Sequence, residues 1–168
     1  MRISGGKMTF RKFAAVALAA SLLVGTAGCT FNSPVASRID YAPADGSQAD
    51  LENLKVRNFI YLTNGTVSAL AGSIVNSSLS ATTLKISYTD ATLNEAKEVV
   101  FTVAAGQKLD LGFNGSEALA IDLGGKAGDI VRINVAEGSG AAVELRVPVL
   151  DGTFDFYKPI IDSLEAVK

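Results

Sequence analysis

Short runs of alternating apolar and polar residues occupy most of the chain between residues 56 and 149. In residues 82–89, for example, Leu84, Ile86 and Tyr88 alternate with polar side chains. This period of two is typical of a β-strand with one buried face. Gly, Asn, Asp and Ser separate the runs, as they do in turns. Eight strands are predicted: residues 56–62, 70–76, 82–89, 99–103, 108–113, 119–123, 130–135 and 143–149.

The order and spacing of these runs predict the fold class. Asn64-Gly65 separates the first two runs and suits a tight turn with positive φ. Pro148 places the last run at a sheet edge or a strand end, because proline has no backbone N–H to donate. No long helical pattern interrupts the series. We therefore expect an all-β protein, an antiparallel immunoglobulin-like sandwich of about seven to eight strands, preceded by an N-terminal signal helix.

The signal helix is predicted from an uncharged apolar run, residues 13–28, that follows a basic leader. Sixteen residues are fewer than the roughly 20 that a helix needs to cross a bilayer. A basic segment followed by a short apolar segment is the layout of a secretory signal. Export is therefore the first prediction.

The end of this run predicts a lipid anchor. Thr26, Ala27 and Gly28 precede Cys29, the single cysteine of the chain, and small residues before a cysteine resemble a bacterial lipobox. Thr26 stands where leucine is commonest in such motifs. Cys29 would become the first residue of the mature protein and carry diacylglycerol. The alternative is an ordinary signal peptide, with Cys29 as an incidental thiol.

Composition then divides the chain into parts. We expect a lipoprotein signal peptide at residues 1–28, a lipidated flexible tether at residues 29–53, a β-sandwich domain at residues 54–160 and a C-terminal tail at residues 161–168. The tether prediction rests on polar composition, two prolines and the absence of apolar periodicity.

The residue types present restrict the possible chemistry. The chain has no histidine, and both methionines, Met1 and Met8, lie in the leader. With Cys29 lipidated, no soft ligand remains for copper, zinc or haem, so we expect no cofactor and no metal site of that kind. No catalytic residue is predicted, although a Ser-Lys pair or paired carboxylates stay possible without a motif. The mature part has eleven basic and seventeen acidic side chains, a net charge of −6 that does not suit nucleic acid.

One cluster near the C-terminus is a candidate pocket. Asp151, Phe154 and Tyr157 lie close together in the sequence, with Phe156 between the two aromatic residues. They would line a small pocket or, alternatively, form a turn whose aromatic rings pack on the end of the sandwich.

Three segments and the lipobox together resemble a family of actinobacterial LpqE-like lipoproteins. The segments are VRNFIYL at residues 56–62, LAGSIVNSSLSATTLKIS at residues 70–87 and VPVLDGTFDFYKPI at residues 147–160. That family is in turn similar to the PCuAC periplasmic copper chaperones, which implies a cupredoxin-like sandwich. The chaperones bind copper through His and Met, and those ligands are missing here. The resemblance therefore implies a fold and a location and assigns no metal ligand.

These observations favour a membrane-anchored extracytoplasmic lipoprotein, a non-enzymatic binding or structural module of the bacterial cell envelope. Its expected partners are membrane lipid, through diacylglyceryl-Cys29, and an envelope protein or ligand that the sequence does not identify. The expected location is the extracytoplasmic face of the cell membrane. A metal-handling, copper chaperone-like lipoprotein and an envelope hydrolase are the alternatives.

Overall fold

The computed structural model describes residues 12–15, 17–18 and 44–166. Two compact units are present, Met1–Tyr41 and Ala42–Lys168. In the first unit the described residues are helical. Cys29 and the lipobox residues Thr26, Ala27 and Gly28 lie outside the described residues. Within the described ranges, no helix is long and apolar enough to cross a membrane.

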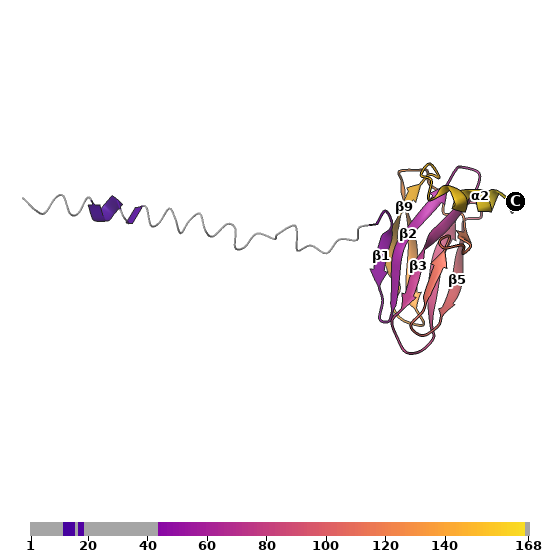
Figure 1. Ribbon diagram of the computed structural model, residues 1–168, viewed down its shortest axis with the longest axis horizontal. Helices are drawn as coiled ribbons and strands as arrows, with labels where there is room; N and C mark the ends of the chain where they lie inside the picture. The colour runs from indigo at the N-terminus through magenta and orange to yellow at the C-terminus, as the bar shows by residue number, and fades with distance from the viewer. Residues whose placement is uncertain (1–11, 16, 19–43, 167–168) are drawn as a thin grey trace, which may run out of the picture. The chain divides into compact units, whose positions relative to one another are not determined.

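The second unit contains nine strands and one helix (Figure 1), and its all-β class is confirmed. Seven of the eight predicted runs form strands of four or more residues, whereas the run predicted at residues 119–123 is a strand only over residues 119–120. The elements are β1 Ser47–Asp50, β2 Leu54–Thr63, β3 Ser68–Asn76, β4 Thr82–Asp90, β5 Glu95–Val103, β6 Lys108–Leu111, β7 Leu119–Ala120, β8 Ile130–Glu137, β9 Val143–Leu150 and α2 Lys158–Ala166.

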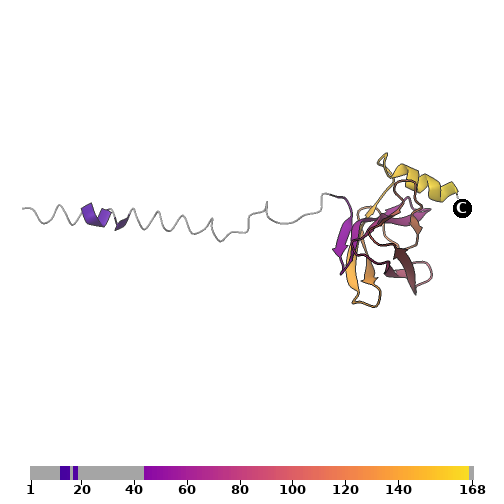
Figure 2. The same ribbon diagram turned by 60° about the horizontal axis from the view of Figure 1, so that its bottom comes forward.

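The strands form one curled sheet with the order β5-β4-β8-β9-β2-β3-β6, to which β1 adds beside β2 and β7 beside β3. Figure 2 shows how the sheet folds over on itself into two layers. The prediction of an antiparallel sandwich fails for one strand pair. β2 and β9 pair in parallel through Tyr61–Val149 and Leu62–Leu150. This pair joins the two layers, and both of its strands finish at the same end of the domain. We call it the helix end, because α2 follows β9 there; β3 finishes and β4 begins at the far end.

The main core lies between the two layers. It contains seventeen buried side chains, which come from strands of both layers and from the segment after β7. In β4, for example, Leu84 and Ile86 are fully buried while Lys85 and Ser87 are not, as the alternation predicts. The buried members are Leu54, Val56, Phe59, Tyr61, Leu70, Ile74, Leu84, Ile86, Val103, Leu111, Ile121, Val131, Ile133, Val135, Leu145, Val147 and Val149.

A second, smaller core lies on the outer face of β2 and β3, where α2 covers it (Figures 1 and 2). Its buried members are Ile60, Leu62, Ala71, Tyr157, Ile160 and Ile161. This cover explains why four successive residues of β2, 59–62, are buried, although alternation would expose every second one. The predicted boundary between domain and tail at residue 160 differs from the structure, because α2 continues to Ala166 and packs on the sheet.

The domain also begins earlier than the predicted boundary at residue 54. Ser47–Asp50 forms β1 and pairs with the outer edge of β2. Asn58, which has a φ of 52°, interrupts the register of β2, and its side-chain oxygen accepts the Gly46 N–H at 2.8 Å. Arg57 donates to the Ala49 carbonyl and forms an ion pair with Asp50. Part of the predicted tether is therefore held to the domain by these polar contacts and by Ala49 and Leu51, which are partly buried against the main core.

Candidate functional site

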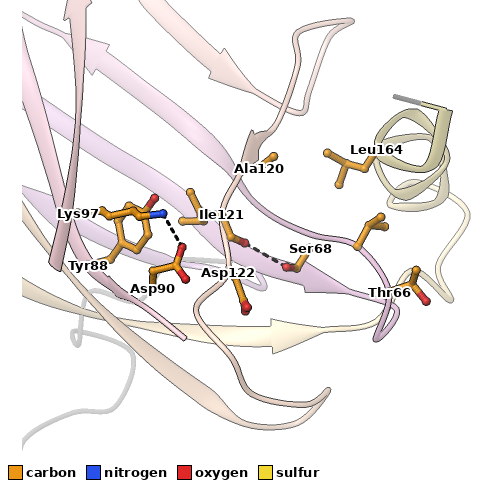
Figure 3. Close-up of a pocket in the computed structure, with 10 residues that line it drawn as sticks. Thr66, Ser68, Tyr88, Asp90, Lys97, Ala120, Ile121, Asp122 and Leu164 are labelled. Carbon is orange, nitrogen blue, oxygen red and sulfur yellow. Dashed lines mark hydrogen bonds and ion pairs between the residues drawn. The ribbon is translucent and has the colours of Figure 1, made fainter. Parts of the chain in front are cut away.

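A cavity of about 400 Å³ opens at the helix end of the domain (Figure 3). It lies where the start of β3, the end of β4, the start of β5, the segment after β7 and α2 come together. Its lining combines charged, hydroxyl and apolar side chains. The lining residues are Thr66, Val67, Ser68, Tyr88, Asp90, Lys97, Ala120, Ile121, Asp122 and Leu164.

An ion pair between neighbouring strands forms one wall of the cavity. Asp90 ends β4, and its Oδ2 atom lies 2.9 Å from the Lys97 Nζ atom of β5. The other carboxylate oxygen of Asp90 accepts the N–H groups of Leu93 and Thr92, at 2.9 and 3.1 Å. These donors, the Leu93 N–H first, hold the pKa of Asp90 below its usual range. The hydrogen bond to Asp90 in turn raises the pKa of Lys97. Both side chains therefore stay charged at neutral pH.

Asp122 ties the segment after β7 to the turn between β4 and β5. One of its carboxylate oxygens accepts the Thr92 hydroxyl at 2.6 Å, and the other accepts the Gly124 N–H at 2.9 Å. Its backbone carbonyl accepts the Ala91 N–H at 2.9 Å. Because the bonds to Thr92 and Ala91 join segments about 30 residues apart, Asp122 fixes the position of this cavity wall.

Tyr61 and Ser68 hold the same segment from the side of the core. The Ser68 hydroxyl donates to the Ile121 carbonyl at 3.0 Å (Figure 3). The Tyr61 hydroxyl accepts the Leu123 N–H at 3.0 Å and donates to the Ile121 carbonyl at 3.4 Å. Burial raises the pKa of Tyr61, so this hydroxyl stays protonated.

These protonation states decide what the cavity can do chemically. Ser68 and Lys97 line the same space, which is the Ser-Lys combination that the sequence leaves open for hydrolysis. Activation of a serine by lysine needs a neutral amine as base, whereas Lys97 is held protonated and the Ser68 proton is directed to a carbonyl. Asp90 and Asp122 also line the cavity, but a carboxyl group that acts as general acid needs a raised pKa, and that of Asp90 is lowered. The arrangement suits a binding surface with fixed charges.

The sequence did not predict this site. Asp90 and Lys97 occupy ordinary strand positions, and Asp122 falls at a polar position of an alternating run. The one sequence signal is the group of polar residues at the end of β4, Thr89 and Asp90, which also fits a plain turn. Long-range contacts bring the site together, those between residues 61–68 and 121–123 and those of Asp122 with the turn after β4.

The aromatic cluster predicted near the C-terminus does come together in space. The ring centroids of Phe154 and Tyr157 lie 6.4 Å apart, and Tyr157 is buried in the second core. Asp151 accepts the Thr153 N–H at 3.2 Å and so stabilises the turn that follows β9. None of these three residues lines the cavity described above. The Tyr157 ring packs on the end of the sandwich, whereas the Phe154 and Phe156 rings are exposed.

The donor set of the domain does not fit a copper site. Cu(I) prefers thiolate, thioether and imidazole ligands. The chain has no histidine, and Met1, Met8 and Cys29 precede the folded unit. In the described ranges, no three His, Cys, Asp or Glu side chains are grouped so that they could hold a metal ion.

The chain is distantly similar in fold to solved PCuAC domains. The copper-bound PCuAC domain from PmoF2 has a TM-score of 0.45 and 12% sequence identity, over 62% of this chain and 97% of that domain. For the apo PmoF2 PCuAC domain the TM-score is 0.46 and the identity 12%, over 64% and 97%. The apo PCuAC domain from PmoF1 gives 0.41 and 16%, over 61% and 97%. No protein-family model matches the sequence, and no curated protein matches it.

Proposed function

We propose that this chain is a lipid-anchored protein of the extracytoplasmic face of a bacterial cell membrane, and that its folded domain is a non-enzymatic binding or structural module of the envelope. The observation that carries the proposal is the uncharged run of residues 13–28, which follows four basic residues and ends at Cys29. A diacylglyceryl group on this thiol would hold the protein at the membrane.

The division of the chain supports the anchor. The compact unit begins at Ala42, thirteen residues after Cys29, so its core forms from residues downstream of the modified position. In the part of the chain that the structure describes, no buried side-chain polar atom lacks a hydrogen-bond partner. A domain with a closed core and satisfied polar groups suits a stable module held outside the membrane.

The binding role is supported by the cavity between β3, β4, β5 and α2. Lys97 places a permanent positive charge beside Asp90, and Ile121 and Leu164 add apolar surface. Fixed charges and apolar walls recognise a ligand without transforming it. Asp90 and Asp122 line the same cavity and offset the Lys97 charge, so the proposed partner is an envelope component that offers an apolar group together with hydrogen-bonding groups.

The experiment that tests the anchor compares Cys29→Ala with the wild-type protein in cell fractions. The substitution removes the thiol, so the variant should leave the membrane fraction and fail to incorporate labelled lipid. Thr26→Leu is the matched control, because leucine is commoner at that lipobox position and anchoring should persist. Retention of Cys29→Ala in the membrane fraction, with no lipid label on the wild-type protein, would contradict the proposal.

The metal-handling alternative has its own test. We expect that the domain does not bind Cu(I) with submicromolar affinity, because the mature chain has no His and no Met. Titration of the purified mature domain with Cu(I) measures this directly. Submicromolar binding would favour copper handling over the module proposed here.

A further inference from the structure

Two phenylalanine side chains lie exposed side by side on the turn between β9 and α2. Phe154 is 57% exposed and Phe156 is 59% exposed, and their rings stack with centroids 5.5 Å apart and 12° between planes. Removal of such a side chain from water is favourable. Two adjacent exposed aromatic rings on a folded domain therefore indicate a surface that contacts a membrane or another molecule. We call these two residues the phenylalanine pair.

The pair is held rigidly. The Phe156 ring packs edge-on against the Tyr157 ring, with centroids 4.3 Å apart, and Tyr157 is only 2% exposed. The Phe154 carbonyl accepts the N–H groups of Tyr157 and Lys158, at 2.9 and 3.1 Å, at the start of α2. The exposed rings are therefore presented by the core rather than by a loose loop.

The pair lies beside the point where the chain enters the domain. The Tyr157 hydroxyl donates to Asp45 Oδ2 at 2.8 Å, and Asp45 is the second described residue of the domain. Residues 30–43 separate Cys29 from this region. At most about 3.5 Å per residue, these fourteen residues reach no farther than about 50 Å. A lipid on Cys29 would therefore keep the helix end within about 50 Å of the bilayer surface and allow it to touch the bilayer.

Other exposed apolar side chains share this end. Ile130, at the start of β8, and Leu93, in the turn after β4, are each 55% exposed. Asp151 precedes the phenylalanine pair in sequence and Asp155 lies between its two members, so the surface does not present clustered positive charge to anionic headgroups. Lys158 is the single basic residue close to the pair in sequence, so these apolar side chains suit insertion into the interface of a zwitterionic bilayer.

We propose that the phenylalanine pair inserts into the interfacial region of the bilayer that holds the lipid of Cys29, and so fixes the orientation of the domain against the membrane. This inference rests on the proposed lipidation of Cys29. It adds a second, peripheral contact to the covalent anchor and directs the helix end toward the lipid.

The test uses the absence of tryptophan from the chain. A Phe156→Trp variant of the full lipidated protein carries one fluorophore at the pair, and a Leu79→Trp variant carries one at the far end, where Leu79 is fully exposed. Both are reconstituted into phosphatidylcholine vesicles with and without brominated acyl chains. We expect Phe156→Trp to emit at shorter wavelength and to lose most of its emission to brominated lipid, and Leu79→Trp to do neither.

The outcomes separate the inference from the anchor. If the vesicles bind Phe156→Trp but brominated lipid leaves its emission unchanged, the anchor stands and the bilayer contact is wrong. A shift to shorter wavelength without quenching means that a protein surface, such as a second copy, covers the pair, and this also overturns the proposal. Failure of the wild-type protein to associate with vesicles removes the lipid anchor itself and the inference with it. If Phe156→Trp does not fold, Phe154→Trp is measured in the same way.

Discussion

The Tyr157 hydroxyl donates a hydrogen bond to Asp45 Oδ2 at 2.8 Å, across 112 residues of sequence. This bond joins the first turn of the folded domain to the aromatic segment before α2. Burial, together with the Asp45 carboxylate, raises the pKa of Tyr157, so the hydroxyl remains a donor at any physiological pH. The contact therefore fastens the end of the predicted tether to the second core.

Removal of this bond should destabilise the domain modestly. Tyr157→Phe keeps the buried ring and deletes only the donor, so we expect a loss of about 1 kcal/mol in the free energy of unfolding. Denaturant unfolding measures it. Asp45→Asn completes a double-mutant cycle, in which the two changes together should cost less than the sum of the single changes. Strict additivity would mean that the two side chains do not interact.

Gly72 is required by close packing against the Phe59 ring. A Cβ atom at Gly72 would overlap the Cδ1 atom of that ring, and Phe59 is fully buried. Gly72→Ala should therefore cost about 1–3 kcal/mol through overpacking. In a Phe59→Leu background the same substitution should cost less, because the ring atoms that collide are gone. An equal cost in both backgrounds would place the strain elsewhere.

Glu137 connects the end of β8 to the start of β2 and should make stability depend on pH. Its carboxylate accepts the Asn53 and Leu54 N–H groups, at 2.7 and 3.0 Å, and the Asn53 side-chain amide at 2.8 Å. Partial burial opposes ionisation, but these donors outweigh it and hold the pKa of Glu137 below its usual range.

The sign of the effect follows from this lowered pKa. In the unfolded chain Glu137 has the ordinary pKa of about 4.3, so its contribution is complete above that pH and is lost as pH falls through the lower folded value. Glu137→Gln should lower the free energy of unfolding by about 1–2 kcal/mol at pH 7. It should also flatten the acid limb of the stability profile, which is the fall in the free energy of unfolding as the pH becomes acidic. Asn53→Ala should flatten it only in part, because both backbone donors remain. An unchanged acid limb in Glu137→Gln would contradict this role.

Ser68 should not react as a nucleophile. A fluorophosphonate probe should leave it unlabelled, because Lys97 is protonated by its pairing with Asp90. Mass spectrometry of the treated full chain reports the label, and Ser68→Ala serves as the blank. Label on Ser68 that is absent from Lys97→Met would favour the hydrolase alternative instead.

The alternation of side chains was sufficient to predict every strand whose one face is buried, as in β4, β8 and β9. It did not reveal β1, because this four-residue strand is held largely by main-chain pairing, Arg57 and Asn58, and Ala49 alone of its residues packs against the core. The C-terminal helix left signals that could have been used: Pro159 in the first turn, with Ile160, Ile161 and Leu164 at helical spacing.

The cavity and the parallel pairing of β2 with β9 depend on contacts between distant segments. Hydrogen bonds from Tyr61 and Ser68 to the Ile121 carbonyl span more than 50 residues. A local pattern does not encode such contacts, because many pairings of the same strands would bury the same side chains. The lipidation of Cys29 differs from these features, because it is predicted from the sequence and Cys29 lies outside the residues that the structure describes.

The mass of the mature N-terminal peptide tests whether Cys29 carries the proposed lipid anchor. The protein is extracted with detergent from the membranes of expressing cells, digested and analysed by mass spectrometry. If Cys29 is lipidated, this peptide begins at Cys29 and carries the added mass of a diacylglyceryl group on its sulfur. A mature N-terminus at any other residue, or an unmodified Cys29 in protein from the membrane fraction, would contradict it.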